Sequence, residues 1–344
     1  MSNNAQLAQI QVPPQAVLVQ LGMGFIVSQA ISVAARLGIA DYLKNGAKSV
    51  EELAAFTDTH APSVYRLMRA LSSAGVFSQD AENRFSNNSV SEFLRSDHPE
   101  SMRGIIHLMG DHEHWRSHGN MLQSVKTGEI AFEYTFGMPV FPYFAANPQV
   151  AEIFDNAMTS FSSVIAPAVA ATYDFSGAKT IADIGGGHGF LLSNVLKTNP
   201  EAQGILFDQP QVVAGANNLL ESHGVSERTQ IVAGNFFEEI PVKADIYLMK
   251  HIIHDWNDEQ SETILRNLAV SAPQGAKLLL VESVVEEGDS PSTSKVMDLN
   301  MLVMTGGKER TAKEYSELFD KTGFRFVAVH PTQSPLQIVE AVKV

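Results

Sequence analysis

Residues 180–190 of the chain read Thr-Ile-Ala-Asp-Ile-Gly-Gly-Gly-His-Gly-Phe. In this stretch an apolar run ends in an acid, Asp183, and a glycine-rich turn then opens into a second apolar segment. That order predicts a strand, a tight turn and a helix, with a ligand lying against the bare backbone of Gly185 and Gly187. A further acid, Asp208, follows Gly185 by about 20 residues, the place where nucleotide-binding sheets hold ribose hydroxyls. We therefore expect an adenosine-containing cofactor.

The glycine spacing discriminates between such cofactors. A dinucleotide fingerprint requires a third glycine, but Phe190 or Leu192 stands at that position. A phosphate loop would need Gly-Lys-Ser/Thr, which is absent, and no Lys or Arg lies between Lys179 and Lys197. S-adenosylmethionine has no phosphate and carries a positive sulfonium, so it suits this neutral-to-acidic turn. A tight connection that binds no ligand is the alternative.

The composition limits the function classes. Of 344 residues, 44% are hydrophobic and 18% charged, which is typical of a globular protein. The net charge of −14 argues against a nucleic-acid partner, since phosphate binding needs clustered Lys and Arg. The absence of cysteine excludes disulfides, thiolate metal sites and a cysteine nucleophile. It also suits a cytoplasmic location, which we expect.

Residues 1–35 contain no charged side chain, and residues 17–35 are long and apolar enough to suggest a membrane span. No basic flank precedes them, and the charged start and cleavage site of a signal peptide are missing. The stretch also contains polar side chains at Gln20, Ser28, Gln29 and Ser32. We therefore expect a long helix buried in a subunit interface and no membrane insertion.

Residues 1–110 are expected to form a mainly helical winged-helix domain. Ser49 and Glu52 have the spacing of a capping box, which predicts the start of a helix. Residues 61–74 predict a second helix, and residues 76–86 read as a hairpin-like wing.

Many winged helices read DNA, so a DNA-binding regulator is an alternative. The second helix carries only Arg66 and Arg69, however, and basic and acidic residues balance in this domain. We expect the domain to pack a homodimer instead.

Residues 111–175 are expected to be a helical connecting region that contributes to an acceptor pocket. The region is rich in aromatic residues and methionine, including Trp115, Met158 and Phe161. Aromatic residues and methionines in this pattern can form either a hydrophobic core or the lining of a ligand pocket. Its place just before the glycine turn favours the pocket.

From residue 176 to residue 344, apolar strand runs alternate with helical patterns. The runs cover residues 179–184, 204–208, 229–233, 244–250, 276–283, 324–330 and 336–342. This alternation predicts a doubly wound, Rossmann-like α/β fold with a mostly parallel, seven-stranded sheet. Only residues 331–335 separate the last two runs, which must therefore form an antiparallel edge hairpin.

Polar residues follow each of the first five runs, at the edge of the sheet where ligands bind. They are Asp183, Asp208, Gln209, Asn235, Lys250, His254, Asp255 and Glu282. His254 is the best candidate base, because an imidazole can take a proton at neutral pH, and His251 is its competitor. Asp255 could hold the imidazole or cap the next helix. Glu309 alone reads as a charge at a helix start.

Several motifs in order resemble one family. They are Asp-Ile-Gly-Gly-Gly-His-Gly at 183–189, His-Asp-Trp at 254–256, Asp-Leu-Asn-Met at 298–301 and Gly-Gly-Lys-Glu-Arg-Thr at 306–311. They are similar to those of the S-adenosylmethionine-dependent small-molecule O-methyltransferases, which include plant caffeate and flavonoid enzymes and bacterial natural-product tailoring enzymes. The similarity covers nearly the whole chain, and in that family the N-terminal winged helix builds an intertwined dimer.

The resemblance implies roles for individual residues. His254 would be the base, oriented by Glu282 and Glu309. Met158 and Met301 match methionines that line the acceptor pocket. The cofactor would contact Gly185 and its neighbours with its methionine part, Asp208 with its ribose, and Asn235, Phe236 and Lys250 around its adenine.

Two departures from the family pattern bear on the substrate. Many members have an acid where Asn235 stands, so the adenine contact here would be a neutral amide. The plant pattern has Asn-Pro before the double glycine, whereas Met304 and Thr305 stand here. This favours a bacterial-type acceptor over plant phenylpropanoids.

The mechanism that fits is in-line methyl transfer to a phenolic hydroxyl, with His254 removing the proton and Glu282 or Glu309 fixing its tautomer. No metal is expected, since no tight histidine–carboxylate cluster is evident. An N-methyltransferase and a non-methylating hydroxylase or rearrangement enzyme of the same fold remain alternatives. The acceptor molecule itself is not identified by the sequence.

Overall fold

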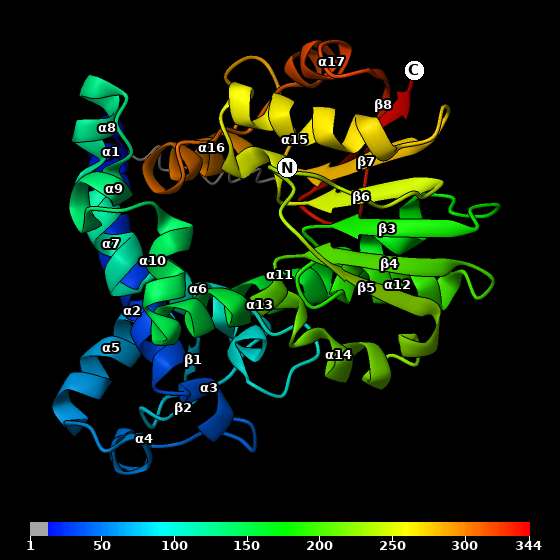
Figure 1. Cartoon of the computed structure of the whole chain (residues 1–344). Helices are drawn as coiled ribbons and strands as arrows, with labels where there is room; N and C mark the ends of the chain where they lie inside the picture. Colours follow the sequence, from blue (N-terminus) through cyan, green and yellow to red (C-terminus); the bar gives the residue numbers. More distant parts are fainter. Residues whose placement is uncertain (1–12) are drawn as a thin grey trace, which may run out of the picture. The chain divides into compact units, whose positions relative to one another are not determined.

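The computed structural model describes residues 13–344, which form two compact units, one ending at Asp111 and the other beginning at His112 (Figure 1). The part of the uncharged stretch before residue 13 lies outside the described residues. The helical region expected at 111–175 packs within the second unit, together with the sheet.

The first unit is mainly helical, as predicted. Its helices are α1 (Pro14–Gly22), α2 (Gly24–Arg36), α3 (Ile39–Tyr42), α4 (Val50–Thr57), α5 (Ala61–Ser73), the 3-10 turn η1 (Ser91–Leu94) and α6 (Arg103–Met109). Strands β1 (Ser78–Gln79) and β2 (Phe85–Ser86) pair antiparallel as the short wing. The predicted capping box is confirmed, because the Glu52 backbone N–H donates to Ser49 Oγ and the Ser49 N–H donates to Glu52.

The predicted long N-terminal helix is divided at Met23 into α1 and α2. Within the described chain, only the segment Pro14–Arg36 is long and apolar enough to cross a membrane, and 6% of its most apolar window is buried. Leu18 and Leu21 expose 73% and 72% of their surface. An apolar face of this kind marks an interaction surface.

The second unit contains the large sheet. Its strands are β3 (Thr180–Ile184), β4 (Gln203–Asp208), β5 (Thr229–Ala233), β6 (Ile246–Lys250), β7 (Lys277–Glu282), β8 (Phe324–Pro331) and β9 (Gln337–Lys343). Its helices are α7 (His112–Gly119), α8 (Met121–Thr127), α9 (Ala131–Phe136), α10 (Val140–Ala146), α11 (Pro148–Thr172), α12 (Phe190–Thr198), α13 (Pro210–Val213), α14 (Ala216–Ser222), α15 (Asp258–Ser271), α16 (Thr293–Met304) and α17 (Ala312–Asp320). The 3-10 turns are η2 (Ser226–Arg228) and η3 (Ile253–Asp255).

The strand order is β5-β4-β3-β6-β7-β9-β8. The first five strands pair parallel, while β9 pairs antiparallel with both β7 and β8. The predicted mostly parallel sheet with an antiparallel edge hairpin is confirmed. Successive strands are added on one side of β3 (β4, then β5) and afterwards on its other side (β6, then β7). The carboxyl ends of β3 and β6 therefore border the crevice where such sheets bind ligands.

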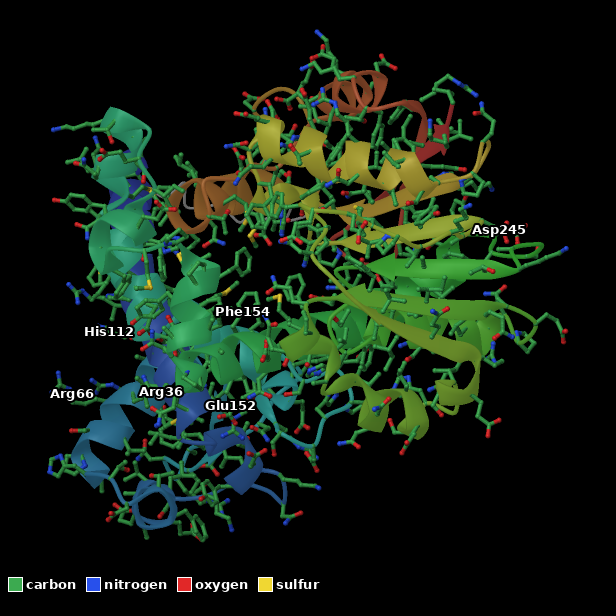
Figure 2. All side chains as sticks on the ribbon, in the orientation of Figure 1. Arg36, Arg66, His112, Glu152, Phe154 and Asp245 are labelled. Carbon is green, nitrogen blue, oxygen red and sulfur yellow. The ribbon has the colours of Figure 1, made fainter. Side chains whose placement is uncertain are left out.

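Alternate residues of the strands enter two separate cores. Ala182 and Tyr247 pack with α15 and α17 on one face, and Ile181 and Leu248 pack with α11, α12 and α14 on the other. Figure 1 shows these two helix layers on opposite sides of the sheet. In Figure 2, Asp245 lies where the parallel strands begin, whereas Phe154 of α11 lies beyond the opposite end, where they finish.

Candidate active site

The glycine turn between β3 and α12 needs residues without a side chain. Gly185, Gly187 and Gly189 have φ of 70°, 60° and 85°, the left-handed region that glycine tolerates best. The Gly185 N–H donates to the Phe207 carbonyl at 2.8 Å, which ties the turn to the end of β4. No heavy atom lies within 4 Å of the place where a Gly187 side chain would begin. The turn therefore offers open backbone to a ligand.

Asp208, at the end of β4, is held against this turn. Its Oδ2 accepts the Gly187 N–H at 2.8 Å and its Oδ1 accepts the Gln209 N–H at 2.7 Å. Burial raises the pKa of Asp208, although the two N–H groups oppose that shift. Each carboxylate oxygen keeps a further lone pair, so this acid can also accept hydrogen bonds from ribose hydroxyls.

Asp183, at the end of β3, is buried under the same turn, with 1% of its surface exposed. No hydrogen bond of normal geometry from the described residues reaches either of its carboxylate oxygens. Burial raises its pKa to about 7, against the opposing effects of Lys250 and the Leu192 backbone N–H. Burial also lowers the pKa of Lys250, and Asp183 opposes that shift. An unsatisfied buried carboxyl of this kind needs a partner.

The residues after β5 form the next side of the site. The Phe236 ring lies close to Gly185, 3.6 Å from where a side chain of that glycine would start. Trp256 meets the Phe236 ring edge-on at 6.1 Å. Asn235 is exposed and its amide binds Glu238 at 3.1 Å. Thus the rings of Phe236 and Trp256 form an aromatic wall beside the glycine turn.

His254 stands in η3, directly after β6, and only 6% of its surface is exposed. Its Nδ1 lies 2.8 Å from Glu309 Oε1 and 3.6 Å from Glu282 Oε2. Glu282 Oε1 instead accepts the backbone N–H groups of Ile252 and Ile253 at 3.1 and 3.0 Å. Glu309 is therefore the hydrogen-bond partner of the imidazole, and Glu282 fixes the turn that carries it.

The carboxylates around His254 decide its charge. Burial opposes the imidazolium, but Glu282, Asp255 and Glu309 outweigh this effect and raise the pKa of His254 to about 10. In turn, burial raises the pKa of Glu282 to about 7 and that of Asp255 to about 6, despite the favourable charge of His254. At neutral pH the free protein therefore holds His254 as an imidazolium.

Asp255 lies on the other side of the imidazole, with its Oδ1 3.7 Å from His254 Nε2. It does not cap the following helix. That cap is Asn257, which forms a complete capping box with Gln260. Asp255 therefore adds negative charge on the Nε2 side of the imidazole.

Arg310 is a site residue that the sequence reasoning missed, although it belongs to the quoted Gly-Gly-Lys-Glu-Arg-Thr motif. It is fully buried. Its guanidinium donates to the carbonyls of Ile253 and Trp256 at 3.0 and 3.1 Å and to Asp258 at 2.8 Å. Arg310 therefore holds both ends of the turn that carries His254. The spacing of residues in the sequence could not reveal these contacts.

Gly307 allows a close approach between the loop that carries Glu309 and the turn that carries His254. A Cβ at this position would overlap the His254 carbonyl oxygen and lie 2.5 Å from the Asp255 carbonyl carbon and 2.7 Å from the Trp256 nitrogen. Only glycine allows the loop that carries Glu309 to approach the turn that carries His254 so closely.

The residues predicted to line the acceptor pocket occupy different positions. Phe161 on α11 lies 5.6 Å from the His251 ring, which stacks on His254. Met301 on α16 is buried, and Met158 on α11 is partly buried. Trp115 on α7 is 37% exposed, and no ring contact joins it to the other predicted site residues in the described part of the chain.

The absence of a tight histidine–carboxylate cluster was predicted, and that prediction is wrong. Ligand atoms of His254, Glu282 and Glu309 all lie within 4.8 Å of one another, a spacing that a metal ion could use. Local sequence could not show this, because the three residues come from separate elements. His254 Nδ1 already binds Glu309, and Glu282 Oε1 holds two backbone N–H groups. We therefore interpret the cluster as one that holds protons.

Known proteins resemble the chain over nearly its whole length. Residues 19–97 match the O-methyltransferase dimerisation domain and residues 115–325 match the O-methyltransferase domain. A phenazine O-methyltransferase from Lysobacter antibioticus is 43% identical over 330 residues, covering 96% of both chains. An 8-amino-8-demethylriboflavin N,N-dimethyltransferase from Streptomyces davaonensis is 32% identical over 329 residues, covering 94% of both.

Solved structures agree with this assignment. The crystal structure of LaPhzM matches with a TM-score of 0.91 and 43% identity over 97% of this chain and 100% of that one. Structures of the same fold include complexes with S-adenosylmethionine and S-adenosylhomocysteine. The alternatives of a DNA-binding regulator and a non-methylating enzyme lose their support. The chain belongs to the O-methyltransferase family and is an S-adenosylmethionine-dependent methyltransferase.

Proposed function

We propose that this enzyme methylates a hydroxyl group on a flat aromatic acceptor, and that His254 accepts the hydroxyl proton. The observation that carries the proposal is the buried hydrogen bond between His254 Nδ1 and Glu309 Oε1 at 2.8 Å. This contact fixes one ring nitrogen, so Nε2 is the nitrogen left to meet an acceptor. The carboxylates beside the ring stabilise the imidazolium that proton transfer forms.

The residues around the glycine turn fit S-adenosylmethionine, which supplies an activated methyl group when bound. Open backbone at Gly187 can receive its methionine part, and the unsatisfied carboxyl of Asp183 suits a cationic amino group. Asp208 would hold the ribose hydroxyls, with Gln209 beside it. Phe236 would flank the adenine, as would Asn235 and Lys250.

The raised pKa of His254 sets how the proton moves. A phenolic hydroxyl has a pKa of about 10, close to that of the imidazolium. The reactive pair therefore holds one proton between the acceptor oxygen and His254, and transfer between them is nearly balanced. Because the free protein already holds a proton on His254, the complex with a neutral acceptor must lose one proton to solvent before the methyl group is transferred.

This arrangement predicts a rising pH profile. Both pKa values lie near 10, so the singly protonated pair becomes more abundant as pH rises from 7. We expect kcat/KM for a phenol to increase by close to tenfold per pH unit between about pH 7 and 9. Initial rates across that range test this. Glu309→Gln removes one stabilising carboxylate and should shift the rise to lower pH, whereas a plateau beginning near pH 7 would contradict the raised pKa.

Cofactor binding provides a separate prediction. Replacing Asp208 by asparagine should weaken binding of S-adenosylhomocysteine about 10- to 100-fold, because hydrogen bonds to a charged group are lost. Isothermal titration calorimetry measures this directly. Asp245 is a matched control, since it also accepts two backbone N–H groups but lies at the opposite end of the sheet (Figure 2). Equal effects of Asp208→Asn and Asp245→Asn would contradict the assignment.

We infer the acceptor class from aromatic and methionine side chains on α10, α11 and α16. Phe161 approaches this part of the site from α11, and Met158 and Met301 are the other predicted lining residues. Phe141 of α10 meets Trp256 at 5.5 Å and adds a further aromatic side. A wall of this composition suits a planar, apolar ring system. The named acceptors of two relatives, a phenazine and a flavin amine, are fused aromatic rings of this kind.

An aromatic amine is the second candidate acceptor, because one relative is an N,N-dimethyltransferase. Incubation with S-adenosylmethionine and paired phenols and anilines, followed by mass spectrometry, separates the two functions. We expect a mass gain of one methyl group on the phenols. Methylation confined to the anilines would overturn the proposed hydroxyl acceptor.

We also propose that the enzyme acts as a cytoplasmic homodimer. Its first unit matches a dimerisation domain over residues 19–97, and α1 and α2 expose the apolar face that a partner would cover. A second copy of the chain explains this face without a membrane. Light scattering that reports a monomer would contradict this proposal.

A further inference from the structure

His251 is a second imidazole beside the proposed base, and its conformation is unusual. It is the last residue before the turn that carries His254, and its φ is +55°. Residues other than glycine rarely adopt this left-handed conformation, and its occurrence at a functional site often reflects a required side-chain position. The backbone is not loose here, because the His251 N–H donates to the Val281 carbonyl at 3.2 Å.

The ring of His251 is held between two residues of the site. It stacks on the His254 ring with a centroid distance of 4.8 Å and an interplanar angle of 10°. Phe161 of α11 lies 5.6 Å from it. Two parallel imidazoles therefore stand together after β6, next to Phe161.

The polar atoms of this ring lack a partner. Among residues 13–344, no hydrogen bond or ion pair involves either ring nitrogen of His251, although the residue is only partly exposed. Burial, followed by the charges of Lys250 and His254, lowers the pKa of His251 well below its ordinary range. The neutral ring presents one donor and one acceptor. A half-buried polar ring that packs on the base without a hydrogen bond is placed to receive one from a ligand.

We propose that His251 is a specificity-determining residue that hydrogen bonds a second polar atom of the acceptor, next to the reacting hydroxyl. The inference rests on the proposed function, since it takes His254 as the group that meets that hydroxyl. Because the two ring centroids lie 4.8 Å apart, we expect an acceptor that engages both rings to carry its two polar atoms close together, as on adjacent or peri positions. A ring nitrogen, a carbonyl or a second hydroxyl satisfies this requirement.

Two probes that differ at one atom test the proposal. In 8-hydroxyquinoline a ring nitrogen stands beside the hydroxyl, and 1-naphthol has a C–H in its place. We expect the wild-type protein to prefer 8-hydroxyquinoline by at least about tenfold in kcat/KM, because sites that bind a polar atom discriminate against analogues lacking it. His251→Phe keeps an aromatic ring but no polar atom. It should abolish this preference, because kcat/KM for 8-hydroxyquinoline should fall about tenfold more than kcat/KM for 1-naphthol.

A control variant and a third probe complete the test. His223 is a matched control, because its ring also packs against a phenylalanine, Phe190, at 5.3 Å. His223→Phe should keep the preference. If His251→Phe does not fold, wild-type kcat/KM for 5-hydroxyquinoline tests the proposal instead. The nitrogen of this probe is far from its hydroxyl, so we expect it to react like 1-naphthol and more slowly than 8-hydroxyquinoline. Equal losses for both probes in His251→Phe, or a wild-type protein that does not distinguish them, would overturn the proposal.

Failure of the proposed function would look different. If mass spectrometry shows no methylation of any probe, the hydroxyl acceptor is wrong, and binding then tests His251 alone. Titration of 8-hydroxyquinoline and 1-naphthol into protein saturated with S-adenosylhomocysteine gives both dissociation constants. A preference that disappears in His251→Phe supports the hydrogen bond, and the same ratio in both proteins overturns it.

Discussion

Replacement of His254 by glutamine should lower kcat for a phenolic acceptor by about 1,000-fold, within the range for loss of a general base. Glutamine keeps a polar side chain of similar length but cannot accept the proton from the hydroxyl. The affinity for S-adenosylhomocysteine should stay within about twofold, because the cofactor is assigned to the glycine turn and Asp208. Steady-state kinetics and calorimetry on the same preparation measure both quantities.

A histidine elsewhere in the same unit provides the control. His330 also pairs with a glutamate, at 2.8 Å from Glu340, but it lies in the β8–β9 hairpin. His330→Gln removes a comparable contact and should leave kcat within about threefold of wild type. Similar losses in both variants would mean that His254→Gln acts through general disruption of the fold.

Replacement of Gly307 by alanine should have the second-largest effect. The added Cβ cannot be accommodated by a side-chain rotation, because the atoms it meets belong to the backbone of His254, Asp255 and Trp256. The two segments must move apart, which would displace Glu309 from His254. We expect a loss of about 100-fold in kcat, since small misplacements of catalytic groups are costly. The free energy of unfolding should fall by about 1–3 kcal/mol.

Gly119→Ala is the matched control for this variant. No heavy atom lies within 4 Å of its added Cβ, at the end of α7. Kinetics and urea unfolding should therefore show little change. A Gly307→Ala enzyme with normal turnover would contradict the close approach that holds Glu309 against the imidazole.

Patterns within short segments predicted most of the fold. The seven strand runs agree with β3 to β9 to within two residues, because buried parallel strands leave continuous apolar stretches and the intervening helices are amphipathic. The antiparallel hairpin also followed from its short connection. The N-terminal stretch was harder. Its largely apolar run predicted one long helix, although Gly22 and Gly24 stand on either side of the break at Met23.

The site was only partly predictable, because its contacts join distant segments. His254 and Glu309 could be named as candidates, but their hydrogen bond spans 55 positions of the chain. For the same reason the sequence left Glu282, Glu309 and Asp255 as alternatives for the residue that orients His254. Arg310 escaped notice because a fully buried arginine cannot be told from a surface one by its neighbours. His251 was seen only as a competitor of His254, since ring stacking depends on a left-handed backbone that no spacing indicates.

The central claim is that His254 accepts the proton of the acceptor, and an acceptor that needs no deprotonation tests it most directly. We would compare wild type and His254→Gln at pH 8 with 1-naphthol and with a nitro-substituted naphthol that is already ionised at this pH. A base is needed only for the first, so we predict a loss of about 1,000-fold with 1-naphthol and less than about tenfold with the ionised acceptor. Equal losses with both acceptors would contradict the role of His254 as the base.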